Sequence, residues 1–297
     1  MREYTFKDKI YMSAIYFIIV LTVIICLYPF LNVVAYSLSG SSAILRGEVT
    51  FYPIDIQFQS FKEILSKDTI WRSMYITIVV TLGGTAVGLV LTTLASYALS
   101  KDYLKGRKVF LWIILFTMYF GGGIIPTFLV VKELNMLDTL WSLFIPTAMN
   151  VFNFIVMRTF FMQLPTSLLE ASKLDGCGEL RILFYIVLPL SLPILATIGL
   201  FYAVDYWNNY FNALMYITEP SKYTLQLQLR QLIFTEELSN INSSVTGASG
   251  EVLQGNQVLS ESLKSASIIV ATVPIILVYP WLQRYFVKGV MLGSVKG

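Results

Sequence analysis

The stretch from Met74 to Leu99 reads MYITIVVTLGGTAVGLVLTTLASYAL and carries no charged residue. A helix needs about 20 apolar residues to cross the ~30 Å hydrocarbon core of a bilayer, so this run is long enough to span a membrane. Its apolar residues are continuous, whereas the strands of a membrane barrel alternate apolar and polar residues. The stretch therefore predicts a transmembrane helix.

Five further apolar runs flank this one. The chain is 56% hydrophobic and 13% charged, against about 25% charged for soluble domains, and its charges lie in the gaps between the runs. The N-terminal run is too long for a secretory signal and is expected to be retained. The sequence predicts an all-α membrane protein with six transmembrane helices, the other five being Tyr11–Tyr36, Val109–Val131, Leu140–Phe161, Phe184–Val204 and Ala266–Phe286.

The distribution of Lys and Arg predicts the orientation. If the N-terminus is cytoplasmic, thirteen of the 21 Lys and Arg residues fall on the inner side, as the positive-inside rule requires. Arg72 and Lys132 lie near the outer ends of spans and count against this orientation. Both termini are predicted to be cytoplasmic, with a short N-terminus (1–10), a first span and outer loop (11–73), a core (74–286) and a C-terminal tail (287–297).

Several classes of function are disfavoured by composition. The chain has no histidine, which removes His-based metal sites, general bases and Ser-His-Asp triads. A net charge of +3 with dispersed basic residues does not indicate a nucleic-acid surface. Cys26 and Cys177 indicate neither a disulfide nor a thiol site. We expect no catalytic residue, no metal site, no cofactor and no nucleic-acid partner.

The gap before the fifth span, LPTSLLEASKLDGCGELRILFYIVLPL from Leu164, predicts a short cytoplasmic helix over 165–176. Pro165 suits a first turn, Ser167 and Glu170 have capping-box spacing, and Gly176 is a favourable stop. The segment is too apolar for a loop that faces only water. It is therefore interpreted as a docking element, with a surface formed by Leu168, Leu169, Ala171, Ser172 and Leu174.

This segment resembles the EAA signature of bacterial ABC importer permeases. The resemblance rests on Glu170-Ala171-Ser172, on Gly176 and on the run from Ile186 to Pro189, with serine standing where alanine is usual. It implies a type I ABC importer permease fold in which 165–176 is the coupling helix, seated in a groove of a cytoplasmic ATPase. Glu170 can cap its own helix, contact the ATPase, or do both. The implied coupling residues are Glu170, Ala171, Ser172, Leu174, Asp175 and Gly176.

Shorter motifs are similar to the carbohydrate-uptake branch of that family, in particular the second permease of maltose-type transporters. They are Trp207-Asn208, Tyr223-Thr224-Leu225 and the C-terminal run from Gln283 to Gly297. The stretch from Phe120 to Thr127 is similar to oligosaccharide permeases that work with a surface lipoprotein.

The resemblance implies a multi-pass permease subunit of the cell membrane that imports a carbohydrate, here an oligosaccharide. Its implied partners are a second homologous permease in a heterodimer, two cytoplasmic ATPase subunits and an extracellular substrate-binding lipoprotein, besides membrane lipid. The chain contains no GxxxxGK motif followed by Ser or Thr, so ATP is expected to be bound by the partner ATPase subunits.

A polar stripe follows the fifth span. Asp205, Asn208, Asn209 and Asn212 are spaced i, i+3, i+4 and i+7, which places them on one face of a continuing helix. Polar groups at membrane depth should face protein or water, so the stripe, with Trp207, is a candidate substrate pathway. The alternative is that it ends the span, with its aromatic residues in the interfacial belt.

Three features have less specific interpretations. Gly84 and Gly88 form a GxxxG spacing that permits close helix packing. The polar stretch 238–264 is expected to be a flexible outer loop, either entering a binding protein or serving as a linker. The stretch Ile56–Leu65 is amphipathic and predicts a short surface helix.

Three alternatives to a carbohydrate permease are an ABC permease for a non-sugar solute, an ATP-independent channel and a membrane enzyme. The EAA signature alone is common to importers of many solutes, so the first differs only in substrate. A channel has no need of an ATPase-docking helix. An enzyme would require ionisable groups within the spans, which are almost free of them.

Overall fold

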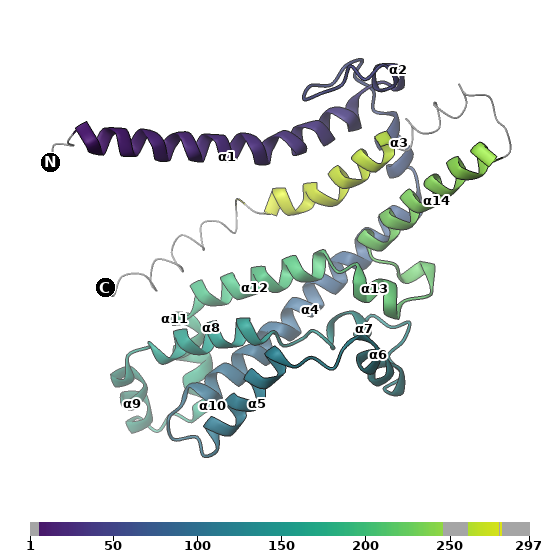
Figure 1. The fold of residues 1–297 in the computed structure, drawn as a ribbon. Coiled ribbons are helices and arrows are strands. Elements are labelled where there is room, and N and C mark those ends of the chain that lie inside the picture. The colour runs from purple at the N-terminus through teal and green to yellow at the C-terminus, as the bar shows by residue number, and fades with distance from the viewer. Residues whose placement is uncertain (1–5, 246–260, 279, 281–297) are drawn as a thin grey trace. The chain divides into compact units, whose positions relative to one another are not determined.

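The computed structural model describes residues 6–245, 261–278 and 280, and every regular element in these residues is helical (Figure 1). Three helices are long and apolar enough to cross a membrane: Ile10–Leu38, Asp68–Ser100 and Glu261–Val278. The number rises to five if two sharply bent helix pairs each count as one span. The continuous helices predicted for the first two spans are confirmed by α1 (Phe6–Leu38) and α4 (Asp68–Ser100).

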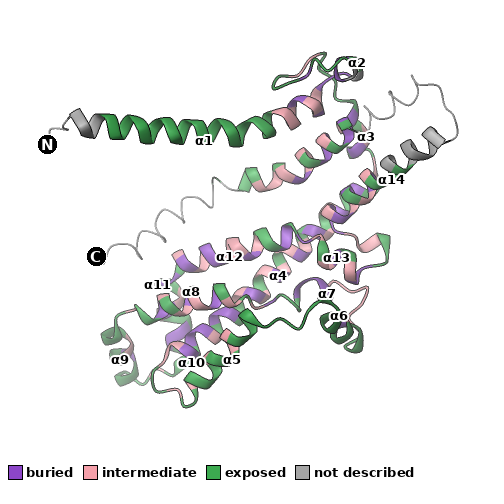
Figure 2. Cartoon of the chain, in the orientation of Figure 1, coloured by how far each residue is buried: buried purple, intermediate pink, exposed green. Residues whose placement is uncertain are grey.

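The chain divides into two compact units. The first comprises Met1–Ile70 and Leu229–Val273, and the second comprises Trp71–Gln228 and Pro274–Gly297. In the first unit, the apolar side chains of α1 are exposed on all sides from Ile10 to Leu31 (Figure 2). A helix that is apolar all round is suited to lipid or to another apolar surface rather than to water.

The segment that follows α1 has a small hydrophobic core of its own. Ala35, Ala43, Ile44 and Val49 form its buried centre, beside the short helix α2 (Ser41–Leu45). The surface helix predicted in this region is confirmed in shorter form as α3 (Gln59–Leu65).

Both ends of the outer loop predicted over 238–264 are helical instead. The helix α14 (Leu225–Val245) continues through its first residues, and the chain is helical again from Glu261. Residues 246–260 and the C-terminal motif from Gln283 lie outside the described residues.

The second unit is built around α4, which packs on the helices that follow it from Val80 to Tyr97. Its buried core includes Met157, Ile182, Ile198 and Tyr202. The helices are α5 (Arg107–Tyr119), α6 (Ile124–Glu133), α7 (Trp141–Phe144), α8 (Val151–Met162), α9 (Thr166–Leu174), α10 (Glu179–Ile182), η1 (Leu183–Val187), α11 (Leu188–Leu190), α12 (Leu192–Trp207), α13 (Phe211–Tyr216) and η2 (Pro220–Lys222).

Three predicted spans are interrupted, so the expectation of continuous helices is wrong for them. The third turns by 116° between α5 and α6, where Gly121 to Gly123 separate the helices, and the fifth turns by 84° at Ser191, between Pro189 and Pro193. The fourth is divided into α7 and α8 by a segment that contains Pro146. Proline removes a helical hydrogen bond and glycine weakens a helix, so apolar length alone overestimated continuity.

The close packing predicted at Gly84 and Gly88 is confirmed, and the partners are two tyrosine rings of α12. A Cβ atom on Gly84 would lie 2.7 Å from the ring of Tyr206, and one on Gly88 would lie 3.1 Å from the ring of Tyr202. The two rings are stacked, with centroids 6.3 Å apart. The missing side chains of α4 therefore make room for aromatic side chains of α12.

Candidate functional site

Two parts of the second unit carry the residues singled out from the sequence. The first is α9, whose start differs from the predicted capping box. The helix begins at Thr166 with Pro165 at the N-cap position, and no side chain caps it. Ser167 therefore lies inside the first turn instead of preceding it. Pro165 precedes the helix instead of lying in its first turn, and the capping-box role assigned to Ser167 and Glu170 is wrong.

The end of α9 follows the prediction. Gly176 has a φ of +77°, and its N–H donates to the carbonyl of Lys173 at 3.0 Å while the N–H of Cys177 donates to the carbonyl of Ser172 at 3.0 Å. These two bonds form a Schellman motif, which pairs carbonyls that the end of a helix otherwise leaves free. Glycine adopts this left-handed conformation without the steric cost of a side chain. The predicted stop at Gly176 is confirmed.

The predicted docking surface lies on this one short element, and most of it is exposed. Ser172 is the only buried side chain within Thr166–Leu174, and its hydroxyl donates to the carbonyl of Leu168. Leu169 is half-buried against the core of the second unit. Leu174 is 89% exposed and Leu168 is 47% exposed. Clusters of exposed apolar side chains are uncommon on soluble proteins and often mark a contact surface. Three further predicted coupling residues are also exposed: Glu170, Ala171 and Asp175.

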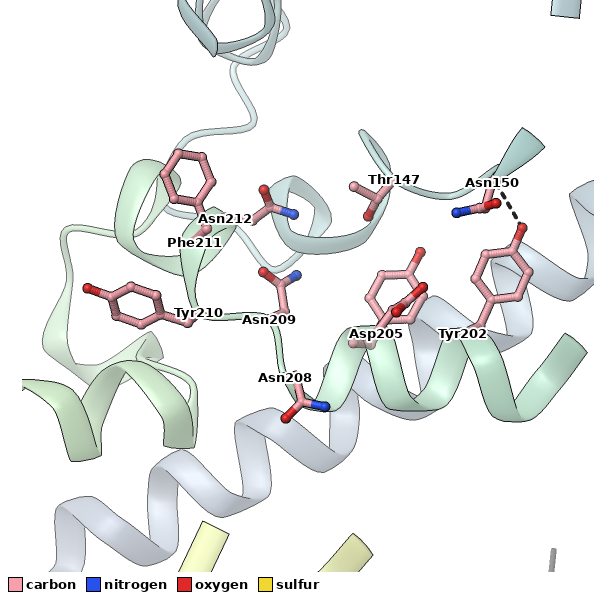
Figure 3. Close-up of a pocket in the computed structure, with 10 residues that line it drawn as sticks. Thr147, Asn150, Tyr202, Asp205, Asn208, Asn209, Tyr210, Phe211 and Asn212 are labelled. Carbon is pink, nitrogen blue, oxygen red and sulfur yellow. Dashed lines mark hydrogen bonds between the residues drawn. The ribbon is translucent and has the colours of Figure 1, made fainter. Parts of the chain in front are cut away.

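The second part is a polar cavity of about 270 Å³ beside the end of α12 (Figure 3). Asp205 supplies the one carboxylate of its wall, and the lining residues, all of them described by the structure, include no basic side chain. Amides, hydroxyls and a carboxylate are groups that exchange hydrogen bonds with a hydroxyl-rich molecule. The lining residues are Thr147, Asn150, Tyr202, Asp205, Tyr206, Asn208, Asn209, Tyr210, Phe211 and Asn212.

The polar stripe predicted here is not a continuous helical face, because α12 ends at Trp207. The Asn208 side chain donates to the carbonyl of Val204, one turn back in its own helix, at 2.9 Å and is exposed. The Asn209 side chain is buried and donates to the carbonyl of Leu143 at 2.9 Å. In Figure 3 these two amides point to opposite sides of the chain.

The other predicted pathway residues also separate. Asp205 points toward the connection that carries Thr147 (Figure 3), and Asn212 reaches the cavity from α13. Trp207 is buried and is not part of the cavity wall. The structure thus places four of the five predicted residues in the cavity wall, but not on one helical face.

Six of the ten lining residues are not among the predicted pathway residues. They are Thr147, Asn150, Tyr202, Tyr206, Tyr210 and Phe211. The Tyr202 hydroxyl accepts the N–H of Asn150 at 2.9 Å and lies 2.6 Å from the hydroxyl of Thr92. The sequence signal for this part of the wall is Pro146, which interrupts the helix and leaves backbone groups available for such bonds.

The described residues contain no group of three or more His, Cys, Asp or Glu side chains that could hold a metal ion.

The fold and the two sites together define a class of protein: a helical membrane protein with several apolar spans, a polar cavity between its helices and a short helix that exposes leucine side chains. These are features of a transport subunit.

Comparison with known proteins identifies the family. Residues 105–292 match the model of the binding-protein-dependent transport system inner membrane component, so the chain belongs to this family of ABC importer permeases. Permeases of this kind are transport subunits, and ATP hydrolysis belongs to their partner ATPase. The chain is therefore not itself an enzyme.

Two relatives and one solved structure match nearly the whole chain. The polygalacturonan/rhamnogalacturonan transport system permease protein YtcP of Bacillus subtilis is 42% identical over 291 residues, covering 98% of this chain and 100% of the relative. Protein LplC of the same organism is 42% identical over 273 residues, covering 92% and 90%. A crystal structure of a bacterial ABC transporter involved in the import of the acidic polysaccharide alginate has a chain that matches with a TM-score of 0.83 and 33% identity, covering 96% of this chain and 100% of that one.

Proposed function

We propose that this chain is the transmembrane permease subunit of an ATP-driven carbohydrate importer, in which it forms half of the translocation pathway and couples to a cytoplasmic ATPase through α9. The observation that carries the proposal is an exposed helix with leucine side chains on its surface, closed by a Schellman motif, at the place where the sequence resembles the EAA signature. The substrate class is supported by relatives named for polygalacturonan/rhamnogalacturonan and for alginate.

The proposed topology has six transmembrane helices in the cell membrane and both termini in the cytoplasm. In this arrangement the two bent helix pairs each count as one span, and α7 with α8 supplies another. The divisions remain 1–10, 11–73, 74–286 and 287–297, with the coupling helix at 165–176. The bias of Lys and Arg toward the inner loops supports this orientation.

The proposed assembly contains a second homologous permease, two ATPase subunits and an extracellular substrate-binding lipoprotein. ATP is bound by the ATPase subunits, and the chain itself requires no cofactor. The exposed apolar face of α1 contacts membrane lipid or another subunit in this assembly. Closure of the ATPase pair displaces α9, and the permeases then change between two rigid-body arrangements.

In this mechanism the polar cavity is part of the substrate pathway. Its amides, hydroxyls and carboxylate can exchange hydrogen bonds with sugar hydroxyls as the substrate passes. Asp205 and Asn212 are the proposed contacts. The side chains of Asn209 and Asn208 already donate to the carbonyls of Leu143 and Val204, and that of Asn150 accepts the N–H of Asn153 at the start of α8.

Polar substitution of the exposed leucines tests the coupling role. The variants Leu168→Asn and Leu174→Asn should greatly reduce receptor-stimulated ATP hydrolysis by the reconstituted complex, because they remove apolar surface that the ATPase would cover. The same change at Leu134, which is 62% exposed at the end of α6, is the matched control and should have little effect. Full stimulation in both α9 variants would refute the proposal.

A further inference from the structure

One carboxylate lies at the centre of a polar cluster beside α9. Glu179, the first residue of α10, accepts hydrogen bonds on both of its oxygens. Its Oε1 accepts from the Tyr103 hydroxyl at 2.5 Å and lies 2.7 Å from the ammonium of Lys173, and its Oε2 accepts from the Tyr97 hydroxyl at 2.7 Å. Hereafter these four side chains are called the Glu179 cluster. They come from α4, the loop after it, α9 and α10.

Two cations flank the aromatic members of this cluster. The Lys173 ammonium lies 4.2 Å from the centroid of the Tyr103 ring, and the Lys101 ammonium lies 4.3 Å from that of Tyr97. Both distances allow cation–π attraction. The carboxylate of Glu179, followed by the Tyr103 hydroxyl, raises the pKa of Lys173 above its ordinary value by hydrogen bonding. Lys173 of α9 is therefore bound by groups outside its own helix.

The cluster joins a buried element to one that is scarcely buried. Tyr97 is only 7% exposed and packs edge-on against Phe161, with ring centroids 6.4 Å apart. On α9, by contrast, the one buried side chain within Thr166–Leu174 is Ser172. The attachment of α9 to the end of α4 therefore depends on directed polar contacts more than on buried apolar area.

A helix-capping role for Glu179 explains only part of this geometry. An acidic residue at a helix N-terminus interacts favourably with the helix dipole, and this requires no partner from another element. Isolated exposed ion pairs also contribute little. Here three donors from three segments converge on one carboxylate, and a hydrogen-bonded network of this kind specifies geometry as well as energy.

We propose that the Glu179 cluster is a mechanical link that fixes the coupling helix to the inner end of α4, so that displacement of α9 by the ATPase moves the α4 membrane span. Glu179 is then a positioning residue, because it acts through α9 and contacts neither nucleotide nor substrate. This inference depends on the coupling role proposed for α9.

The test follows the far end of α4 in the assembled complex. A single cysteine is placed at Tyr75, which is 65% exposed near the start of α4, in a background where Cys26 and Cys177 are replaced by serine. The rate of maleimide labelling is measured without nucleotide and after trapping with ATP and vanadate. In the otherwise unchanged chain the two rates should differ.

The nucleotide response is the difference between these two labelling rates. In Glu179→Gln it should fall by about threefold to tenfold, as expected when one coupled network is broken. ATP hydrolysis and co-purification of the ATPase should continue. Tyr97→Phe, which removes one donor and keeps the ring, should give a smaller loss. Glu48→Gln removes the carboxylate of an exposed ion pair with Arg46 at 3.0 Å and should change nothing.

Two results would overturn the link: an unaltered nucleotide response in Glu179→Gln, or no response of the Tyr75 position in the unchanged chain. Loss of the ATPase from the Glu179→Gln complex would also overturn it, since the cluster would then serve docking. Photo-cross-linking from position 174 separates these results from failure of the proposed function. A retained cross-link to the ATPase with no change in response refutes only the link, and an absent cross-link refutes the coupling role of α9 itself.

Discussion

The α9 segment and the wall of the polar cavity reach their arrangements in different ways. In α9 the residues predicted to act together are neighbours in sequence, and one local motif at Gly176 sets where they end. In the cavity α12 stops at Trp207, so the predicted residues beyond it do not share its face. Asn209, for example, is held by a backbone carbonyl 66 residues away in sequence.

This difference shows which kind of site a sequence pattern can describe. A short exposed helix depends on local signals, and these can be read from the types and spacing of its residues. A cavity wall depends on where several elements end and on which polar groups they satisfy in one another. The two sites should therefore respond differently to small substitutions, and glycine and asparagine pairs in this chain allow direct comparisons.

The largest expected effect concerns the support of the cavity. In Gly84→Ala the new Cβ would meet the Tyr206 ring at 2.7 Å, and overpacking of this kind costs about 1–3 kcal/mol. Gly83→Ala is the matched control, because nothing lies within 4 Å of its added Cβ. Thermal unfolding of the purified complex should show a lower Tm for Gly84→Ala only. Equal Tm values would show that the Tyr206 ring can move to accommodate the added methyl group.

The next effect separates two adjacent asparagines of the cavity wall. Asn209→Ala removes a buried donor to the Leu143 carbonyl, which should cost about 1–3 kcal/mol of stability. Asn208→Ala removes an exposed bond within its own helix and should stay within about 0.5 kcal/mol. Both are measurable from unfolding of the complex in detergent. The reverse order would mean that Asn208, and not Asn209, holds this wall.

On the other side of the comparison, the left-handed residue at the end of α9 should resist substitution. Gly176→Ala places a side chain at a φ of +77°, which costs roughly 1–2 kcal/mol. Gly178→Ala has a φ of −72° and no neighbour within 4 Å of its added Cβ. Receptor-stimulated ATP hydrolysis should fall in the first variant and remain in the second. Equal activity in the two variants would show that coupling does not depend on the Schellman motif.

The smallest effect depends on pH. The hydroxyl of Thr218, followed by the backbone N–H groups of Thr218 and Glu219, donates to Asp138 and lowers the pKa of its carboxyl. Because the folded pKa lies below the unfolded one, this stabilisation is present above the unfolded value of about 3.9 and is lost as pH falls through the folded value.

In Asp138→Asn the Tm should be lower near neutral pH, and its difference from the unchanged chain should narrow at acid pH. Asp55→Asn is the control, since Asp55 is exposed and has a φ of 53° against 54° for Asp138. A Tm difference that did not depend on pH would contradict the role given to the Asp138 carboxylate.

Much of the fold could be predicted where one physical signal dominates. Continuous apolar length identified α1 and α4, and Gly176 identified the end of α9. The third, fourth and fifth spans were predicted as unbroken because apolar length was given more weight than Gly121–Gly123, Pro146 and the prolines beside Ser191. The breaks at these residues are local, and their signals are present in the sequence.

The cavity could be predicted only in part, because its wall depends on tertiary contacts. No glycine or proline between Asp205 and Asn212 signals that α12 stops at Trp207, so a continuing helical face was the natural expectation. Tyr202 reads as one more aromatic residue of a span until its hydroxyl is seen between Thr92 and Asn150. The Glu179 cluster was missed for the same reason, since Tyr97 and Glu179 are 82 residues apart in sequence.

Site-specific photo-cross-linking from position 174 tests the central claim most directly. Leu174 is 89% exposed on α9, and a photoreactive amino acid placed there in the assembled complex should capture the ATPase subunit. The same probe at Leu214 of α13, which is 45% exposed, should not. Capture of the ATPase from position 174 alone is the predicted result, and labelling of position 174 by a membrane-impermeant reagent from outside intact cells would contradict the account.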